Sequence, residues 1–88
     1  MNVEVLFFGR LRELATRQRI ISIINGAQLT DLIELLAKEY GDEFRQVVTH
    51  LEGLRILING GEHDLLDGME TPLQDGDVVV FLPITAGG

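Results

Sequence analysis

The stretch that decides the fold is LTDLIELLAKEY, residues 29–40, whose apolar positions predict one amphipathic helix. These positions recur at intervals of three and four residues, which places them on one face of a helix. The expected buried stripe comprises Leu29, Leu32, Ile33, Leu36, Ala37 and Tyr40. Thr30 is the expected N-cap, and Gly41 is expected to end the helix in the left-handed conformation. A shorter helix is expected to follow from about Asp42, and Gly53 ends it.

Apolar segments that favour strands lie on both sides of this helix. Residues 3–8 and 19–24 precede it and predict a hairpin with a wide connection. Residues 54–58 and 78–82 follow it and predict two further strands. The polar segment 62–70 between them fits a short edge strand or an irregular loop.

Two of these segments, residues 3–8 and 78–82, look buried on both faces, which predicts inner strands that pair parallel with each other. A hairpin, a crossover helix and later strands give an α+β fold, with a mixed sheet of four to five strands packed on one main helix. This is the β-grasp arrangement of ubiquitin. We expect residues 1–83 to form one such domain and residues 84–88 to be a flexible, extended tail that ends in Gly-Gly.

The composition excludes several classes of protein. The chain has 88 residues, no cysteine and two histidines, so it has no disulfide framework, no zinc-finger spacing and no thiol nucleophile. No apolar run approaches the roughly 18 residues of a membrane span, and no signal peptide is recognisable. We therefore expect a cytoplasmic location.

The charge is acidic and unevenly distributed. The net charge of −7 argues against nucleic acid and against an anionic membrane as partners, because both bind clustered cations. Residues 1–20 contain four basic and two acidic residues, a net of +2, whereas residues 21–88 contain three basic and twelve acidic residues, a net of −9. This asymmetry favours docking onto a basic partner, or else it simply keeps a small protein soluble.

The usual catalytic and metal-binding constellations are missing from the sequence. His50 is expected on the second helix, in a context more typical of a surface residue than of a general base. The acidic segment around His63 has the residue types of metal ligands but not the alternating spacing of a calcium loop, so we expect no metal site.

The C-terminus is the feature of the sequence that favours chemistry. The chain stops at Gly87-Gly88, shortly after an apolar strand and Pro83. Glycine has no Cβ, so such a tail can pass through a narrow channel and present its terminal carboxylate to a nucleotide phosphate. Thr85 and Ala86 are small enough to follow it. The alternative is a frayed end or a cloning scar without function.

Four blocks of the sequence carry a family resemblance. They are VLFFGRLREL (5–14), ING (58–60), LQDGD (73–77) and VFLPITAGG (80–88). The blocks run in the family's order and together span essentially the whole chain. On these blocks the sequence resembles the MoaD/ThiS family of ubiquitin-like sulfur carriers, and within that family it is most similar to the small subunits of molybdopterin synthase.

The resemblance implies a mechanism centred on the carboxylate of Gly88. An E1-like adenylyltransferase of the MoeB or ThiF type would adenylate this carboxylate with ATP and Mg²⁺. A sulfur donor would then displace AMP to leave a thiocarboxylate, which makes the last residue 1-thioglycine. The chain would bind no cofactor and would not be catalytic alone. It would donate sulfur for molybdopterin as the small subunit of molybdopterin synthase, in a heterotetramer with a large subunit of the MoaE type.

The resemblance also implies two groups of contact residues. The tail that inserts into the large subunit would consist of Thr85, Ala86 and Gly87. Arg12 and Leu82 match positions that contact partner proteins, and Phe81 would support them. The alternation of the last strand leaves a core position for Leu82 equally open.

Two departures from the family pattern leave other functions open. Leu82 stands where the molybdopterin branch often has the first of two prolines, and segment 62–66 is more polar than the interface segment of some relatives. One alternative is a ubiquitin-like modifier of the Urm1 or small archaeal modifier type, joined to lysines of target proteins. Chains of such a modifier would use Lys38, the only lysine, or the N-terminus. The others are a sulfur carrier for thiamine or another sulfur pathway, and a β-grasp binding module with an inert tail.

Overall fold

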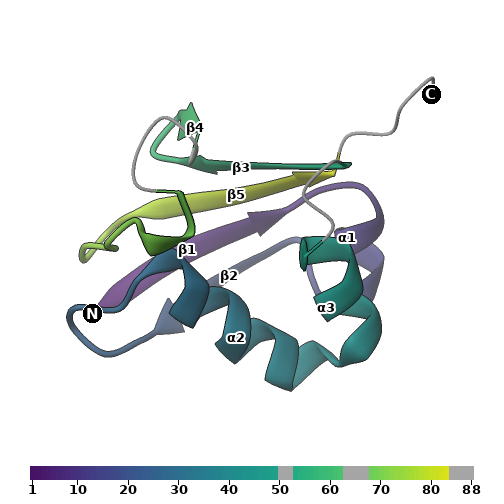
Figure 1. Cartoon of the computed structure of the whole chain (residues 1–88), viewed down its shortest axis with the longest axis horizontal. Coiled ribbons are helices and arrows are strands. Elements are labelled where there is room, and N and C mark those ends of the chain that lie inside the picture. The colour runs from purple at the N-terminus through teal and green to yellow at the C-terminus, as the bar shows by residue number, and fades with distance from the viewer. Residues whose placement is uncertain (50–52, 63–67, 84–88) are drawn as a thin grey trace.

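The chain begins with two strands, continues with two helices and returns to the sheet with its later strands (Figure 1). The structure is a computed structural model that describes residues 1–49, 53–62 and 68–83. Its elements are β1 (Asn2–Phe7), α1 (Arg10–Leu14), β2 (Gln18–Ser22), α2 (Leu29–Tyr40), α3 (Asp42–Thr49), β3 (Leu54–Ile58), β4 (Gly61–Glu62), the 3₁₀ turn η3 (Gly68–Glu70) and β5 (Val78–Pro83).

β1 and β5 are inner strands of a five-stranded sheet with the order β2-β1-β5-β3-β4. β1 pairs antiparallel with β2 and parallel with β5, and β5 pairs antiparallel with β3. α2 and α3 lie on the same side of this sheet (Figure 1). The predicted parallel pairing of the first and last strands is confirmed. The short edge strand expected in segment 62–70 is β4, which begins one residue earlier; residues 63–67 lie outside the described residues.

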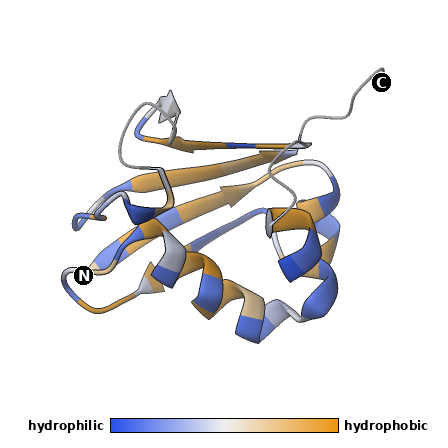
Figure 2. Cartoon of the chain, in the orientation of Figure 1, coloured by the Kyte–Doolittle hydropathy of each residue, from blue (hydrophilic) through white to orange (hydrophobic). Residues whose placement is uncertain are grey.

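The hydrophobic core lies between the sheet and the two long helices. Val3, Val5 and Phe7 alternate along β1 and are fully buried. The ring of Phe7 stacks on that of Phe81, with centroids 5.4 Å apart, and meets the ring of Phe44 edge-on at 5.8 Å. Figure 2 shows that β5 is apolar along its length. The aromatic cluster therefore ties the two inner strands to α3, and buried rings of this size contribute much of the stability of a small domain.

The segment that joins the first two strands contains a helix that the sequence did not predict. Residues Arg10–Leu14 form α1, in the place of the wide connection that we expected. Gly9 precedes α1 with a φ of 58°, a left-handed conformation that glycine adopts without strain. Leu11 is fully buried and anchors the turn. A helix of five residues is too short to display a periodic apolar stripe, so the sequence pattern does not reveal it.

The start of α2 corrects the predicted N-cap. The cap is Gln28 and not Thr30, which lies inside the helix. The backbone N–H of Gln28 donates to the Asp31 carboxylate at 2.8 Å, and the Gln28 side chain accepts from the backbone N–H of Asp31. This reciprocal capping box satisfies two helix-end donors, and a single Thr30 cap would satisfy one. The other end agrees with the prediction, because Gly41 ends the helix with a φ of 98°.

Two of the sequence blocks meet in one network at the end of β3. Asn59 has a φ of 52°, and together with Gly60 it forms the tight turn between β3 and β4. The Asn59 side chain donates to the Asp77 carboxylate at 2.8 Å and accepts from the Val78 N–H at 2.9 Å. Asp77 also accepts from the backbone N–H of Gln74 at 2.8 Å. The Asn-Gly and Asp-Gly-Asp signals are therefore two halves of one structural support for the start of β5.

Replacing Asn59 is expected to destabilise the fold. Asn59→Ala removes both side-chain hydrogen bonds and forces alanine into the left-handed region, so we expect a loss of about 2 kcal/mol in the free energy of unfolding. Asn59→Gly removes the same bonds without the backbone strain and should lose less. Chemical denaturation of the three proteins measures both differences. Equal stability of wild type and Asn59→Ala would show that this network does not support the fold.

Candidate functional site

The face of the sheet opposite α2 and α3 is the candidate docking surface. On β1, Leu6 lies between Val5 and Phe7, which are fully buried toward the helices, so Leu6 points to the other side. The same alternation on β5 and β3 completes this surface, which we call the open face. It is formed by Glu4, Leu6, Arg55, Leu57, Val78, Val80 and Leu82.

The strand register arranges the apolar side chains of the open face in rows. Leu6 pairs with Val80, and Val80 pairs with Leu57, so these three residues form a row across three neighbouring strands. In a further row, Leu82 lies opposite Arg55. All of these leucine and valine side chains are half-buried. A contiguous apolar area of this kind on a small domain is typical of a protein-binding surface.

Arg12 borders the open face where β1 ends. Its guanidinium lies over the ring of Phe8, 5.1 Å from the ring centroid, and its Nε donates to the carbonyl of Phe7 at 3.3 Å. Phe8 is 37% exposed, and its N–H donates to the carbonyl of Phe81 at 3.1 Å, which places it beside the end of β5. α1 thus presents a cation at the edge of an apolar surface, where it is able to meet a carboxylate of a partner.

The end of β5 is held firmly against the rest of the fold. Pro83 pairs with Leu54 of β3, and a Cβ built on Gly9 would lie 3.6 Å from the Pro83 ring. The turn before α1 thus lies in van der Waals contact with the proline, and glycine is favoured at position 9 by its φ of 58°. The first and last sequence blocks, VLFFGRLREL and VFLPITAGG, meet here. Their contact fixes the point from which the chain continues toward its C-terminus.

The structure separates the predicted contact residues. Arg12 is exposed and Leu82 is half-buried on the open face, so both are accessible to a partner. Phe81 is fully buried in the core. Its side chain therefore packs on the core side of β5, whereas that of the neighbouring Leu82 lies on the open face. The predicted tail residues Thr85, Ala86, Gly87 and Gly88 lie outside the described residues, as does His50.

Sequence reasoning missed several residues of the open face. Leu6, Leu57 and Val80 make up the row at its centre, and Arg55 lies opposite Leu82 in the next row. Phe8 lies along its border. The sequence did contain a signal for an exposed apolar face. Residues 3–8 and 78–82 have apolar side chains on both faces of their strands, and a lone helix cannot cover both faces of a sheet. The spatial neighbours, however, depend on the register between β1, β5 and β3, which the sequence does not specify.

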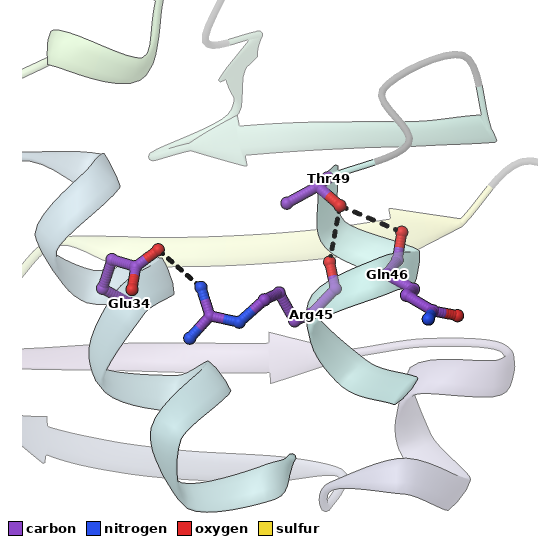
Figure 3. Close-up of polar contacts among 4 residues, drawn as sticks. All are labelled: Glu34, Arg45, Gln46 and Thr49. Atoms are coloured by element: carbon purple, nitrogen blue, oxygen red, sulfur yellow. Dashed lines mark hydrogen bonds and ion pairs between the residues drawn. The ribbon is translucent and has the colours of Figure 1, made fainter. Parts of the chain in front are cut away.

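Much of the acidic charge lies on the helices, away from the open face. Glu34 of α2 accepts from Arg45 of α3 at 2.8 Å, and the Thr49 hydroxyl donates to the carbonyl of Arg45 at 2.8 Å (Figure 3). Figure 3 shows how this pair bridges the two helices. The basic partner expected from the net charge of residues 21–88 would therefore meet the helical side. The open face and its border carry the guanidinium groups of Arg55 and Arg12 together with the carboxylate of Glu4.

A second ion pair joins the helices to the sheet. Arg19 of β2 donates to the carboxylate of Glu39 and, at 2.9 Å, to the hydroxyl of Tyr40. The hydrogen bond from Arg19 lowers the pKa of Glu39, and the hydrogen bonds to Glu39 and Tyr40 raise the pKa of Arg19. Both groups are exposed to solvent, so the pair has a structural role of small energetic weight.

Among residues 1–49, 53–62 and 68–83, no three histidine, cysteine or acidic side chains are grouped so that they could hold a metal ion. Within the same residues, no helix is long and apolar enough to cross a membrane. The metal-ligand types noted around His63 lie outside the described residues. The open face and the end of β5 are thus the features of the described chain that point to a function.

Comparison with known families assigns the chain. The model of the ThiS family matches residues 5–88. The chain therefore belongs to the ThiS family of small ubiquitin-like sulfur carriers, which are not catalysts on their own. The resemblance seen in the four sequence blocks is confirmed.

Two similar proteins have different names. The chain is 34% identical over 92 residues to the "Small archaeal modifier protein 3" of Haloferax volcanii, with all of both chains covered. It is 29% identical over 90 residues to the "Molybdopterin synthase sulfur carrier subunit" of Mycobacterium tuberculosis, with all of this chain and 99% of that one covered.

Solved structures confirm the fold class. The small archaeal modifier protein 1 of Methanosarcina acetivorans superposes with a TM-score of 0.77 at 30% identity, covering 99% of this chain and 96% of that one. A chain in the Helicobacter pylori complex of subunits 1 and 2 of the molybdopterin-converting factor superposes with a TM-score of 0.62 at 31% identity, with both chains fully covered. The predicted α+β, β-grasp architecture is therefore confirmed.

Proposed function

We propose that this chain carries sulfur on the terminal carboxylate of Gly88 and donates it for molybdopterin synthesis, as the small subunit of molybdopterin synthase. The observation that carries the proposal is the open face, bordered by Arg12 and lying beside the fixed end of β5, from which the chain runs on to Gly87-Gly88. The name of the Mycobacterium tuberculosis relative supports the choice of pathway.

The chemistry requires activation of the carboxylate, because a carboxylate is a poor electrophile at neutral pH. In the proposed reaction, the Gly88 carboxylate attacks the α-phosphorus of ATP, which forms an acyl adenylate and releases pyrophosphate. A persulfide sulfur then attacks the carbonyl carbon and expels AMP, giving an acyl disulfide. A thiol cleaves the disulfide bond, so that the thiocarboxylate leaves and the donor and the thiol become joined. This chain has no cysteine, so the partner proteins supply every thiol.

The open face would recognise the activating and acceptor proteins. Its row of Leu6, Val80 and Leu57 suits an apolar patch on a partner. Arg12 and Arg55 suit carboxylates around that patch, which would set the orientation of the complex. The Helicobacter pylori complex, in which a similar chain is bound to subunit 2 of its molybdopterin-converting factor, supports a large subunit as one such partner.

The fixed end of β5 limits where the partner's active site lies. Residues 84–88, five residues beyond Pro83, span at most about 17 Å when fully extended. The fold would thus act as a rigid holder that sets the origin of the tail, and the absence of Cβ atoms at Gly87-Gly88 would let its end enter a narrow channel. A partner that binds the open face must place its reactive centre within that reach.

Reconstitution tests the proposal. The full chain, incubated with a MoeB-type adenylyltransferase, ATP, Mg²⁺ and a persulfide donor, is expected to gain about 16 Da at its C-terminus as sulfur replaces oxygen. A large subunit of molybdopterin synthase, added next, should return the mass to its starting value as the sulfur is used. The same mixture without ATP is the control. An unchanged mass, with an activating enzyme that loads its own carrier, would contradict the sulfur-carrier function.

A modifier function is the second candidate, and the 34% identity to the Haloferax volcanii modifier protein favours it. In that case the adenylated Gly88 would be joined to lysine amines of target proteins. Covalent conjugates that survive denaturation and carry a Gly-Gly remnant on lysine would identify it. Lysine-linked conjugates between copies would depend on Lys38, an exposed residue of α2 and the only lysine, so Lys38→Arg would remove them and leave only conjugates through the N-terminus.

A further inference from the structure

β2 is an outer strand of the sheet, and alternate residues of it present their backbone groups outward. The N-terminal amine of Met1 donates to the carbonyl of Ile23, and the Ile23 N–H donates to the carbonyl of Met1, so these two residues form a hydrogen-bonded pair. In an antiparallel ladder such pairs alternate with pairs that do not bond to each other. The N–H and C=O groups of Gln18, Ile20 and Ser22 therefore point away from β1.

Large apolar side chains lie exposed along this edge. Ile20 is 67% exposed and Ile24 is 77% exposed. Natural edge strands are usually protected by a lysine, a proline or a bulge, and residues 18–24 contain neither lysine nor proline. The one cation of this segment, Arg19, points to the helical side and pairs with Glu39. The edge is thus open to strand addition.

A hollow of about 310 Å³ lies beside the end of β2, against the start of α2. Its lining is formed by Ser22, Ile23, Ile24, Asp31 and Leu35. Most of this lining is apolar, with one carboxylate from the exposed residue Asp31. A pocket of this size accepts an apolar side chain, and the carboxylate favours a cation next to it.

We propose that the β2 edge is a second docking site, which takes an extended segment of a partner protein as an added strand. The backbone of that segment pairs with Ile20 and Ser22, and one of its apolar side chains enters the hollow. A lysine or arginine two residues away, on the same face of the added strand, pairs with Asp31. The face of the partner segment that meets the helices therefore carries a Val, Ile or Leu and, two residues away, a lysine or arginine.

A second copy of the chain fits this edge less well. Its Ile21 is buried in its own core and its Arg19 is paired with Glu39, so its β2 has no apolar side chain free on the helical side to fill the hollow. Each copy also has a net charge of −7, which opposes self-association. A cationic partner segment with a free apolar side chain is able to fill the hollow and is not repelled by the charge of this chain.

The β2 site lies at the other end of the sheet from the tail. Ser22 pairs with Asn2 at the start of β1, whereas Phe81, near the end of β5, pairs with Phe7 at the end of β1. Five residue steps of strand separate the two positions, about 17 Å. Figure 1 shows the N-terminus and the end of β5 at opposite sides of the molecule. One protein is therefore able to hold the β2 edge while another acts at the open face.

Selection of short random peptides against the immobilised full-length chain tests the site. Enriched peptides are expected to carry a Val, Ile or Leu and, two residues away, a lysine or arginine, and on binding to shift the amide resonances of residues 18–24 and of the first turns of α2. Ser22→Pro removes an outward N–H and should weaken binding about tenfold, whereas Ser22→Ala keeps that N–H and should bind like wild type. Methylation of the peptide's own pairing amides should abolish binding even if Ser22→Pro does not fold.

The charge contact is tested on α2. Asp31→Asn keeps an acceptor for the capping box and should weaken binding of cationic peptides about fivefold while removing its salt dependence. Glu34→Gln, one turn further along the same helix, does not line the hollow and pairs with Arg45 in the wild type, so it should leave binding unchanged. Enriched peptides without the apolar and basic pattern, or peptides that shift only the open face, would overturn the proposal. A dimer that forms through β2 and is broken by Ile20→Lys would assign the edge to a second copy and overturn it as well.

Discussion

A chain that lacks Gly88 is expected to receive no sulfur from the activating enzyme. Deletion moves the terminal carboxylate back by one residue, about 3.5 Å, so it no longer reaches the α-phosphorus of ATP bound at a fixed distance from the docking surface. We expect the rate of thiocarboxylate formation to fall at least ~100-fold. Addition of one alanine after Gly88 should have the same effect, because the reactive carboxylate then belongs to another residue. Mass spectrometry after reconstitution measures both.

The stability of these tail variants separates a chemical effect from a structural one. The buried core extends from Val3 to Phe81, so neither variant should change the unfolding midpoint. Efficient loading of the shortened chain would contradict the assignment of Gly88 as the reactive residue. Loading of the extended chain at an internal position would do the same.

Leu82→Glu is expected to prevent docking while the fold remains intact. Leu82 is half-buried on the open face and its neighbour across the strands is Arg55, so a carboxylate fits within the free protein. In a complex, that carboxylate would be buried against an apolar patch, and an unpaired buried charge costs several kcal/mol. We expect the dissociation constant for the activating enzyme and for the large subunit to rise at least ~100-fold, measured by calorimetry.

Lys38→Glu is the matched control for this substitution. It changes the net charge by twice as much, on the exposed side of α2, and should leave both affinities nearly unchanged. A similar loss of affinity in both variants would mean that overall charge, and not the open face, governs docking. Unchanged affinity in Leu82→Glu would remove the open face from the proposed function.

The longer, regularly patterned elements of the fold were predictable from the sequence. The strand at 54–58 has the predicted bounds and the main helix ends at Tyr40 as predicted, because each has a clear periodicity and a glycine or Asn-Gly signal at its end. The parallel pairing of β1 with β5 followed from two segments whose side chains are apolar on both faces of the strand. The chemistry expected at Gly87-Gly88 rests on sequence alone and stays a prediction.

The features that sequence could not specify depend on contacts between distant residues or on very short elements. α1 has a single fully buried residue, Leu11, and so has no stripe to detect. The N-cap of α2 depends on the reach of the Asp31 side chain back to Gln28. Phe81 and Leu82 are both apolar, and the register of β5 between β1 and β3 decides which of them is buried.

The position of β5 between β1 and β3 has a mechanical consequence. A force applied along the chain beyond Pro83 pulls β5 along its own axis, against neighbours on both sides. Ladder hydrogen bonds lie across the strands, so such a force loads all of them together in shear and does not open them one after another. The chain end that a partner would bind is thus attached to a strand that is paired on both sides and resists extraction. Withdrawal of a tail from a deep channel would then release the partner before it unravelled the domain.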